Sequence, residues 1–210
     1  MTMSWKYNHP FTNAFTWAMM LFMIMGFVVL NVIGKETLFW YLNQQHSHTG
    51  DLFFRYFTHV GDGLFMLAVG VVLIGLGKRK LGIMMLIAFI ASGLIIQSIK
   101  KFKPEPRPGR YFTQIDRIHK VEDQPLTGNN SFPSGHTTTA FAFFSMLAFS
   151  SRVYGMQLFY FILALLVGYS RIYLGHHFFK DVYVGSIIGF ITSLIVVWSL
   201  RNKLNFIRQD

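Results

Sequence analysis

The sequence predicts an all-α protein, a bundle of six transmembrane helices. Two observations lead to this fold class. Hydrophobic residues make up 52% of the 210 residues and charged residues only 13%, and the mean hydropathy is +0.40, which is too apolar for an ordinary water-soluble domain. Charge-poor runs also approach the length of about 20 helical residues that is needed to cross a hydrocarbon core of about 30 Å.

The predicted spans follow one another along most of the chain. Each must be helical, because backbone polar groups in lipid have to be satisfied within their own segment. The second span is short and rich in glycine, and the fourth has threonines in its first turn, so hydropathy alone ranks both below the others. The first run lacks a small-residue cleavage site after it and is interpreted as a retained anchor. The six spans cover residues 14–33, 61–77, 81–99, 134–150, 156–175 and 181–200.

We expect one integral-membrane domain over residues 1–210, with a first span and an interfacial segment in residues 1–60 and a core in residues 61–200. Residues 34–59 mix aromatic and polar side chains, and two interpretations stay open. They form either an amphipathic interfacial helix or a cap packed over the bundle. His46 and His48 have no third ligand at usable spacing, so they do not predict a metal site.

Gly185 and Gly189 form a GxxxG pair on the last predicted span. Glycines at this spacing allow two helices to approach closely. The pattern favours packing within the bundle and leaves a homodimer face as the alternative.

Three polar motifs contain side chains suited to phosphate chemistry. Arginine binds phosphate oxygens through paired hydrogen bonds, and lysine adds a point charge. Histidine attacks phosphorus and transfers protons, and an aspartate four positions later can orient it if a helix begins near the histidine. The first motif contains Lys100 and Arg107-Pro108, the second is Pro133-Ser134-Gly135-His136, and the third contains Ser170-Arg171, His177 and Asp181.

The second motif has the features of a helix start. Ser134 is a good N-cap, and Gly135 lets the backbone come close to a ligand. Exposed amides and the helix dipole at such a start attract an anion. We therefore expect Ser134 and Gly135 to contribute to anion binding, with His136 at the polar edge of a span.

In their order and spacing these motifs resemble the type 2 phosphatidic acid phosphatase superfamily. That pattern reads Lys, six residues, Arg-Pro; then Pro-Ser-Gly-His; then Ser-Arg, five residues, His, three residues, Asp, and every position matches within residues 60–200. The resemblance implies that His177 becomes phosphorylated, that Asp181 orients it, and that His136 acts as acid and then as base. His176 is the nearest rival, but the spacings from Arg171 and to Asp181 select His177. The residues expected to bind phosphate are Lys100, Arg107, Ser134, Gly135 and Arg171.

The resemblance implies an integral-membrane lipid phosphate phosphatase or diphosphatase with its active site at one membrane face. Undecaprenyl pyrophosphate is slightly favoured as substrate on family grounds. The alternatives are a phosphatidylglycerophosphate phosphatase, a broad-specificity phosphatidic acid phosphatase and, more remotely, a non-catalytic phospholipid binder or transporter. No carboxylate cluster lies near the motifs, so we expect no metal and no cofactor. The expected partners are the lipid phosphate and the bilayer, with no nucleic acid.

Orientation depends on the distribution of the basic residues. With a cytoplasmic N-terminus, eight of the 19 Lys and Arg residues lie in inner segments and eleven in outer ones. This count is the reverse of the inner excess that the positive-inside rule predicts. Seven of those eleven lie in residues 100–120, where an anionic substrate requires cations. The Lys78-Arg79-Lys80 turn and the basic C-terminus are then the cleaner indicators. They predict cytoplasmic ends and a site that faces the exterior. The family resemblance implies the same for bacterial members, so we expect a multi-pass protein of the bacterial cytoplasmic (inner) membrane whose site faces the periplasm or exterior.

Overall fold

The computed structural model describes residues 10–121 and 126–200, and these form helices and connecting loops with one isolated bridge between Glu105 and Asn130. Four of the eight basic residues counted in inner segments lie outside the described residues, namely Lys6, Arg201, Lys203 and Arg208. In chain order the elements are η1 (Pro10–Thr12), α1 (Ala14–Val32), α2 (Lys35–Asn43), α3 (His48–Phe57), η2 (Thr58–Gly61), α4 (Gly63–Gly75), α5 (Arg79–Phe102), α6 (Pro108–Tyr111), η3 (Ile115–Arg117), α7 (Gly135–Ser150), α8 (Tyr154–Tyr173) and α9 (Phe179–Leu200).

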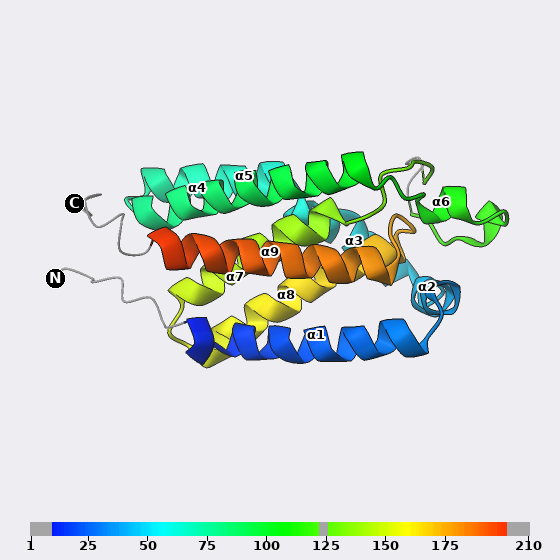
Figure 1. Cartoon of the computed structure of the whole chain (residues 1–210), viewed down its shortest axis with the longest axis horizontal. Coiled ribbons are helices and arrows are strands. Elements are labelled where there is room, and N and C mark those ends of the chain that lie inside the picture. Colours follow the sequence, from blue (N-terminus) through cyan, green and yellow to red (C-terminus); the bar gives the residue numbers. More distant parts are fainter. Residues whose placement is uncertain (1–9, 122–125, 201–210) are drawn as a thin grey trace.

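Six helices, α1, α4, α5, α7, α8 and α9, run along the length of the molecule, and α7 lies among them (Figure 1). Twelve of the 16 residues of α7 are buried, on every side of the helix. The short helices α2, α3 and α6 gather at one end, whereas the α4–α5 and α7–α8 turns lie at the other (Figure 1). One end of the bundle is therefore covered by short helices, and the other end consists of tight turns.

Four of these helices, α1, α5, α8 and α9, are long and apolar enough to span a membrane. A fifth candidate arises if α3 with η2 and α4 count as one broken span, bent by 58°. The predicted spans 61–77 and 134–150 coincide with α4 and α7, but each is shorter than a full crossing. Because α7 is sheathed by other helices, its length and its threonines are not constrained by contact with lipid.

The outer surface of the bundle is apolar. Large hydrophobic side chains that would be buried in a soluble protein are exposed here, and so many exposed apolar groups identify a membrane protein. On α1 the exposed large hydrophobic side chains are Trp17, Met20, Leu21, Ile24, Met25, Phe27, Val28 and Val32.

The two glycines of the GxxxG pair lie directly against α7. A Cβ on Gly185 would come within 2.7 Å of the Ser134 carbonyl oxygen, and one on Gly189 would meet the Thr138 carbonyl oxygen. The Thr138 hydroxyl donates a hydrogen bond to the Gly185 carbonyl at 3.0 Å across this contact. The interpretation as packing within the bundle is confirmed, and the covered glycines do not form a dimer face.

Residues 34–59 form a cap over the end of the bundle where α2, α3 and α6 lie (Figure 1). Phe39 of α2 is buried against Phe178, with ring centroids 5.3 Å apart, and Phe54 of α3 lies 4.6 Å from the ring of Tyr173. Tyr41 and other aromatic side chains of the same segment are exposed. The packed-cap interpretation therefore describes the inner face, and the outer face keeps the aromatic character of an interfacial segment.

Buried carbonyl groups of the cap are satisfied by one amide side chain. Asn43 donates hydrogen bonds to the carbonyls of Ile172 and Tyr173, both at 3.0 Å, and accepts one from the His119 amide at 2.9 Å. Because buried polar groups need partners, this side chain fixes α2 against the C-terminal end of α8.

Replacing Gly189 with Ala should lower the thermal unfolding midpoint in detergent, because the added methyl group has no space against α7. Overpacking of this kind costs about 1–3 kcal/mol. Gly155→Ala is the matched control, since a Cβ at this exposed helical glycine has no neighbour within 4 Å. Equal midpoints for the Gly189 variant and the wild type would contradict the close α7–α9 contact.

Candidate functional site

A buried carboxylate joins the second and third motifs. Asp181, in the first turn of α9, is 1% exposed, and its Oδ2 accepts hydrogen bonds from the Ser131 hydroxyl at 2.5 Å and from the Phe178 amide at 3.0 Å. The same oxygen lies 3.4 Å from Nδ1 of His177, which is 2% exposed. The Asp181 carbonyl accepts a hydrogen bond from the Ser134 amide at 3.0 Å, so α9 is fixed to the start of α7.

The turn that follows α8 positions His177. Gly175 has φ = 74°, and the amides of Gly175 and His176 donate to the carbonyls of Ile172 and Arg171, which is the hydrogen-bond pattern of a Schellman motif. A Cβ at Gly175 would also lie 2.8 Å from Ile118. Glycine is therefore required here, both for its positive φ and for the close approach of the loop.

The expectation that a helix begins near His177 needs a small correction. The helix α9 begins at Phe179, and His177 lies before it. The contact with Asp181 is therefore not made across one helical face. It arises because Asp181 caps the turn, accepting from the Phe178 amide while its Oδ2 also faces the imidazole.

Burial lowers the pKa of His177 to about 4. The positive charges of Arg171 and Arg107 act in the same direction, whereas the Asp181 carboxylate opposes them. The net effect keeps the ring neutral above about pH 5, which is the state in which an imidazole nitrogen is nucleophilic. Since Nδ1 faces Asp181, Nε2 is the nitrogen left for a ligand.

The cations of the first motif are held by one asparagine. Lys100 Nζ donates to the Asn130 carbonyl at 2.9 Å, and Arg107 Nε donates to the Asn130 Oδ1 at 2.9 Å. Backbone hydrogen bonds from Arg107 to Gly128 and from Ser131 to Glu105 align the two loops. The first motif is thereby tied to the segment that leads into the second.

The start of α7 has the predicted form, with Ser134 as its N-cap. The Ser134 hydroxyl oxygen accepts hydrogen bonds from the amide and the hydroxyl of Thr137, and the residue is fully buried. Among the described residues the amides of Gly135 and His136 have no hydrogen-bond partner. These two amides, together with the helix dipole, are the groups that this turn can offer to an anion.

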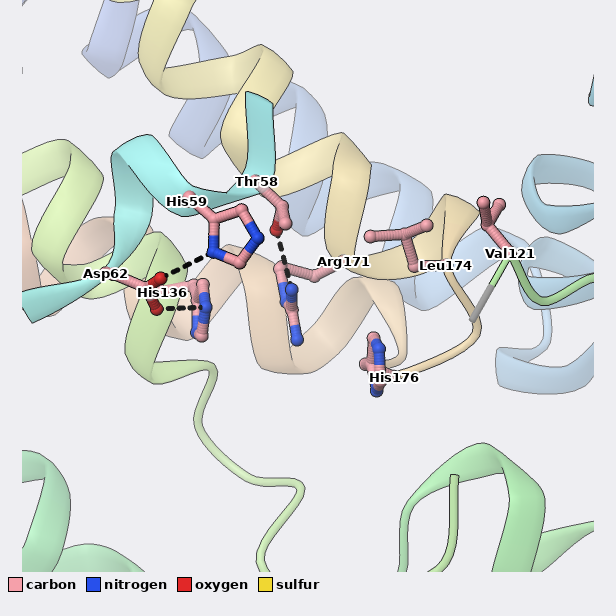
Figure 2. A pocket seen from close by; sticks show the side chains of 8 residues that line it. All are labelled: Thr58, His59, Asp62, Val121, His136, Arg171, Leu174 and His176. Carbon is pink, nitrogen blue, oxygen red and sulfur yellow. Dashed lines mark hydrogen bonds and ion pairs between the residues drawn. The ribbon is translucent and has the colours of Figure 1, made fainter. Parts of the chain in front are cut away.

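A cavity of about 180 Å³ opens between η2, α7 and the end of α8 (Figure 2). Arg171 lies at its centre, is 5% exposed, and donates a hydrogen bond from its guanidinium to the Thr58 hydroxyl at 2.6 Å. A cavity of mostly polar side chains around a buried guanidinium suits an anionic group. The lining residues are Thr58, His59, Asp62, Val121, His136, Arg171, Leu174 and His176.

The structure brings the predicted site residues to one region, although not all of them line this cavity. His136 and Arg171 do, whereas His177 and Asp181 are not among its lining residues. Lys100, in the last turn of α5, and Arg107, at the start of α6, are joined through Asn130 to the loop before α7. The rival His176 lines the cavity and, among residues 10–121 and 126–200, has no carboxylate contact like that of His177. Its burial lowers its pKa well below the ordinary value.

Sequence reasoning missed four polar residues of the site. Ser131 and Asn130 precede the second motif. Ser131 contacts Asp181 of the third motif, and Asn130 contacts Arg107 of the first. Thr58 accepts a hydrogen bond from Arg171. Asp62 contacts His136. A signal existed for Asp62, because a charged residue between two glycines at the start of an apolar run is a candidate functional group. Asp62 was not predicted because it precedes all three motifs in the sequence.

No group of three His, Asp or Glu side chains in residues 10–121 and 126–200 is arranged to hold a metal ion. The stacked pair His46 and His119, with ring centroids 3.9 Å apart, belongs to the cap and not to the cavity.

Comparison with known proteins places these motifs in a family context. A family profile described as the PAP2 superfamily matches residues 81–205. The chain is 30% identical over 151 residues to the bacitracin transport permease protein BcrC of Bacillus licheniformis, covering 70% of each protein. It is 44% identical over 91 residues to the undecaprenyl-diphosphatase BcrC of Bacillus subtilis, covering 41% of this chain and 43% of that protein. The crystal structure of Aquifex aeolicus LpxE superposes with a TM-score of 0.68 at 30% identity, over 77% of this chain and 93% of the other.

The ring of His177 should stay neutral in mildly acidic solution. With its pKa lowered to about 4, the nitrogen-15 signals of the ring in the ligand-free protein should keep the neutral pattern from pH 8 to about 5.5. A histidine of ordinary pKa, about 6.5, is roughly nine-tenths protonated at the lower pH. The signals are assigned by their loss in His177→Gln, and half-protonation above pH 6 would contradict the buried site.

Proposed function

The chain belongs to the PAP2 superfamily, and on this premise we propose that it is an integral-membrane lipid phosphate phosphatase or diphosphatase that acts through a phosphohistidine. The buried Ser131–Asp181–His177 cluster carries this proposal. In this cluster Nδ1 of the neutral His177 faces Asp181, and Nε2 is left to attack phosphorus. The buried Arg171 and the half-buried Arg107 belong to the same site. A protein that only bound phosphate would have no use for an oriented nucleophile.

In the first step Nε2 of His177 attacks phosphorus and the bond between phosphorus and the leaving oxygen breaks. His136, which lines the cavity beside Arg171, donates a proton to that oxygen, so the lipid leaves as an alcohol or a monophosphate. Asp181 stabilises the positive charge that develops on the His177 ring, because its Oδ2 faces Nδ1.

In the second step a water molecule attacks the phosphohistidine. His136, now neutral, takes a proton from this water, the nitrogen–phosphorus bond breaks, and inorganic phosphate leaves. The proton that His136 gave to the leaving oxygen is thus replaced within the cycle. The enzyme returns to its starting charge.

Charge neutralisation is assigned to Lys100, Arg107 and Arg171, with the amides of Gly135 and His136 at the helix start that Ser134 caps. Preorganised cations and amides stabilise the negative charge of the transferring phosphoryl group. These groups supply the electrostatic stabilisation that a bound metal ion provides in other phosphatases. We therefore propose a metal-independent reaction that uses no cofactor.

The favoured substrate is a lipid diphosphate such as undecaprenyl pyrophosphate. This follows the name of the B. subtilis relative and the number of cations at the site, which exceeds the need of one phosphate monoester. The transferred phosphate would face His177, and the second phosphate would lie in the cavity beside Arg171 and His136. The alternatives are phosphatidylglycerophosphate and, for a broad-specificity enzyme, phosphatidic acid.

For the membrane topology we propose that all six long helices cross the bilayer, with α4 completed by the bent α3–η2 segment and α7 shielded inside. The Lys78-Arg79-Lys80 turn lies at the end opposite the cap (Figure 1). Placed on the cytoplasmic side by the positive-inside rule, this turn directs the site toward the periplasm or exterior of a bacterial cytoplasmic membrane. The chain acts as one domain, and its catalytic core begins near Thr58 rather than at residue 61, because Thr58 contacts Arg171.

Replacing His177 with Ala should reduce phosphate release from a lipid diphosphate by at least about 10³-fold, because the proposed covalent intermediate forms on its ring. Assays of purified protein in detergent with EDTA measure the phosphate. His176→Ala is the matched control and should keep most of the activity. Substantial turnover by the His177 variant, or an equal loss in both variants, would contradict the assignment of the nucleophile.

Undecaprenyl pyrophosphate or a shorter isoprenyl diphosphate should show a higher kcat/KM than phosphatidic acid. A single additional charged hydrogen bond contributes about 1.5–3 kcal/mol, so the expected difference is about tenfold or more. The measurement compares a panel of lipid phosphates in one detergent. If phosphatidylglycerophosphate is turned over far more efficiently than any isoprenyl diphosphate, the substrate choice is wrong and the phosphatase assignment is unaffected.

A further inference from the structure

One carboxylate of the cavity lies between two histidines. Asp62 Oδ1 is 2.7 Å from Nε2 of His136, and its Oδ2 is 2.8 Å from Nδ1 of His59. Figure 2 shows Asp62 bridging the two rings at one side of the cavity. The side chains are 31%, 38% and 58% exposed from His136 through Asp62 to His59, so the cluster leads from the cavity wall to solvent.

The backbone is built to bring Asp62 to this place. Asp62 stands at the break between η2 and α4 and is flanked by two glycines. A Cβ on Gly61 would lie 2.9 Å from the His136 carbonyl oxygen and 2.6 Å from Val167. The chain at Gly61 therefore touches the first turn of α7, and this approach requires a residue without a side chain.

We propose that Asp62 is a positioning residue for His136, holding its ring by Nε2 and stabilising the protonated imidazole that donates to the leaving oxygen. This inference rests on the proposed phosphatase function. The ring nitrogen Nδ1 of His136 has no hydrogen-bond partner among the described residues, and the His136 side chain lines the same cavity. Nδ1 is thus the nitrogen that delivers the proton, while Nε2 keeps its own proton in the hydrogen bond to Asp62.

The charges around His136 explain why it needs such a partner. Arg171 from α8 faces the same cavity with a permanent positive charge, and His176 and His59 are the other titratable groups that line it. A cation nearby disfavours a second positive charge on His136. The Asp62 carboxylate offsets that repulsion, as Asp181 does on the nucleophile side. Each catalytic histidine then has its own aspartate.

The inference is tested by leaving-group dependence and by the pH profile of Asp62→Asn, which removes the charge and keeps the shape. Turnover of an isoprenyl diphosphate should fall by about 10- to 100-fold, part of the 10²–10⁴ that a general acid contributes. Turnover of p-nitrophenyl phosphate, whose leaving oxygen needs no proton, should change much less. The alkaline limb of the kcat profile for the diphosphate should move to lower pH by about one unit.

Two further variants keep the result interpretable. Asp51→Asn removes another carboxylate that contacts a histidine, His119, at 2.8 Å in the cap, and it should leave both the leaving-group dependence and the pH limb unchanged. Asp62→Glu keeps the negative charge and should recover most of the lost turnover. If the Asn variant folds poorly, the alkaline limb of the kcat profile of Asp62→Glu tests the proposal, because it should stay near the wild-type position.

Equal losses for both substrates, or an alkaline limb that stays in place in Asp62→Asn, would overturn the role of Asp62. The same holds if Asp62→Glu has the displaced limb expected of the Asn variant. If the wild type itself releases no phosphate from any lipid phosphate, the proposed function fails instead. The two failures are therefore distinguishable in one set of assays.

Discussion

The structure depends most on the burial of Asp181. A carboxylate that is 1% exposed within an apolar helix bundle has to be satisfied, because an unpaired buried charge is very costly. It is satisfied by the Ser131 hydroxyl, the Phe178 amide and the neighbouring His177 ring, and its backbone carbonyl accepts from Ser134. One residue thus ties the loop before α7, the start of α7 and the turn before α9 into a single unit.

Close packing of α7 and α9 makes this arrangement rigid. Gly185 and Gly189 bring the two helices into backbone contact, so the N-cap of α7 and the first turn of α9 have little freedom to separate. The cap adds a second restraint, because Asn43 holds the end of α8 from which Arg171 and the His177 turn project. A phosphoryl-transfer site benefits from such fixed groups, since positioned charges need no reorganisation during the reaction.

The cations of the site show how the electrostatics are balanced. Arg171 and Arg107 face a neutral His177, and burial with their charge holds its pKa near 4. Arg171 donates a hydrogen bond to the Thr58 hydroxyl, and Arg107 and Lys100 donate to the oxygen atoms of Asn130. An anion entering the cavity would therefore meet cations whose side chains are already positioned by hydrogen bonds, which favours the binding of a phosphate.

The sequence by itself determined the helical membrane class and the approximate limits of helices α1, α4, α5, α7, α8 and α9, because hydropathy and helix length are local properties. It also predicted the eight candidate site residues from the spacing of the motifs. It also indicated that the GxxxG pair favours packing. Only the tertiary structure decided that Asp62, Thr58, Ser131 and Asn130 join the site, since each contacts its partner across elements far apart in the chain. It also decided that residues 34–59 form a packed cap and that α7 is shielded from lipid. Such contacts depend on how the helices pack and on the paths of the loops. Local sequence patterns such as hydrophobic periodicity do not predict them.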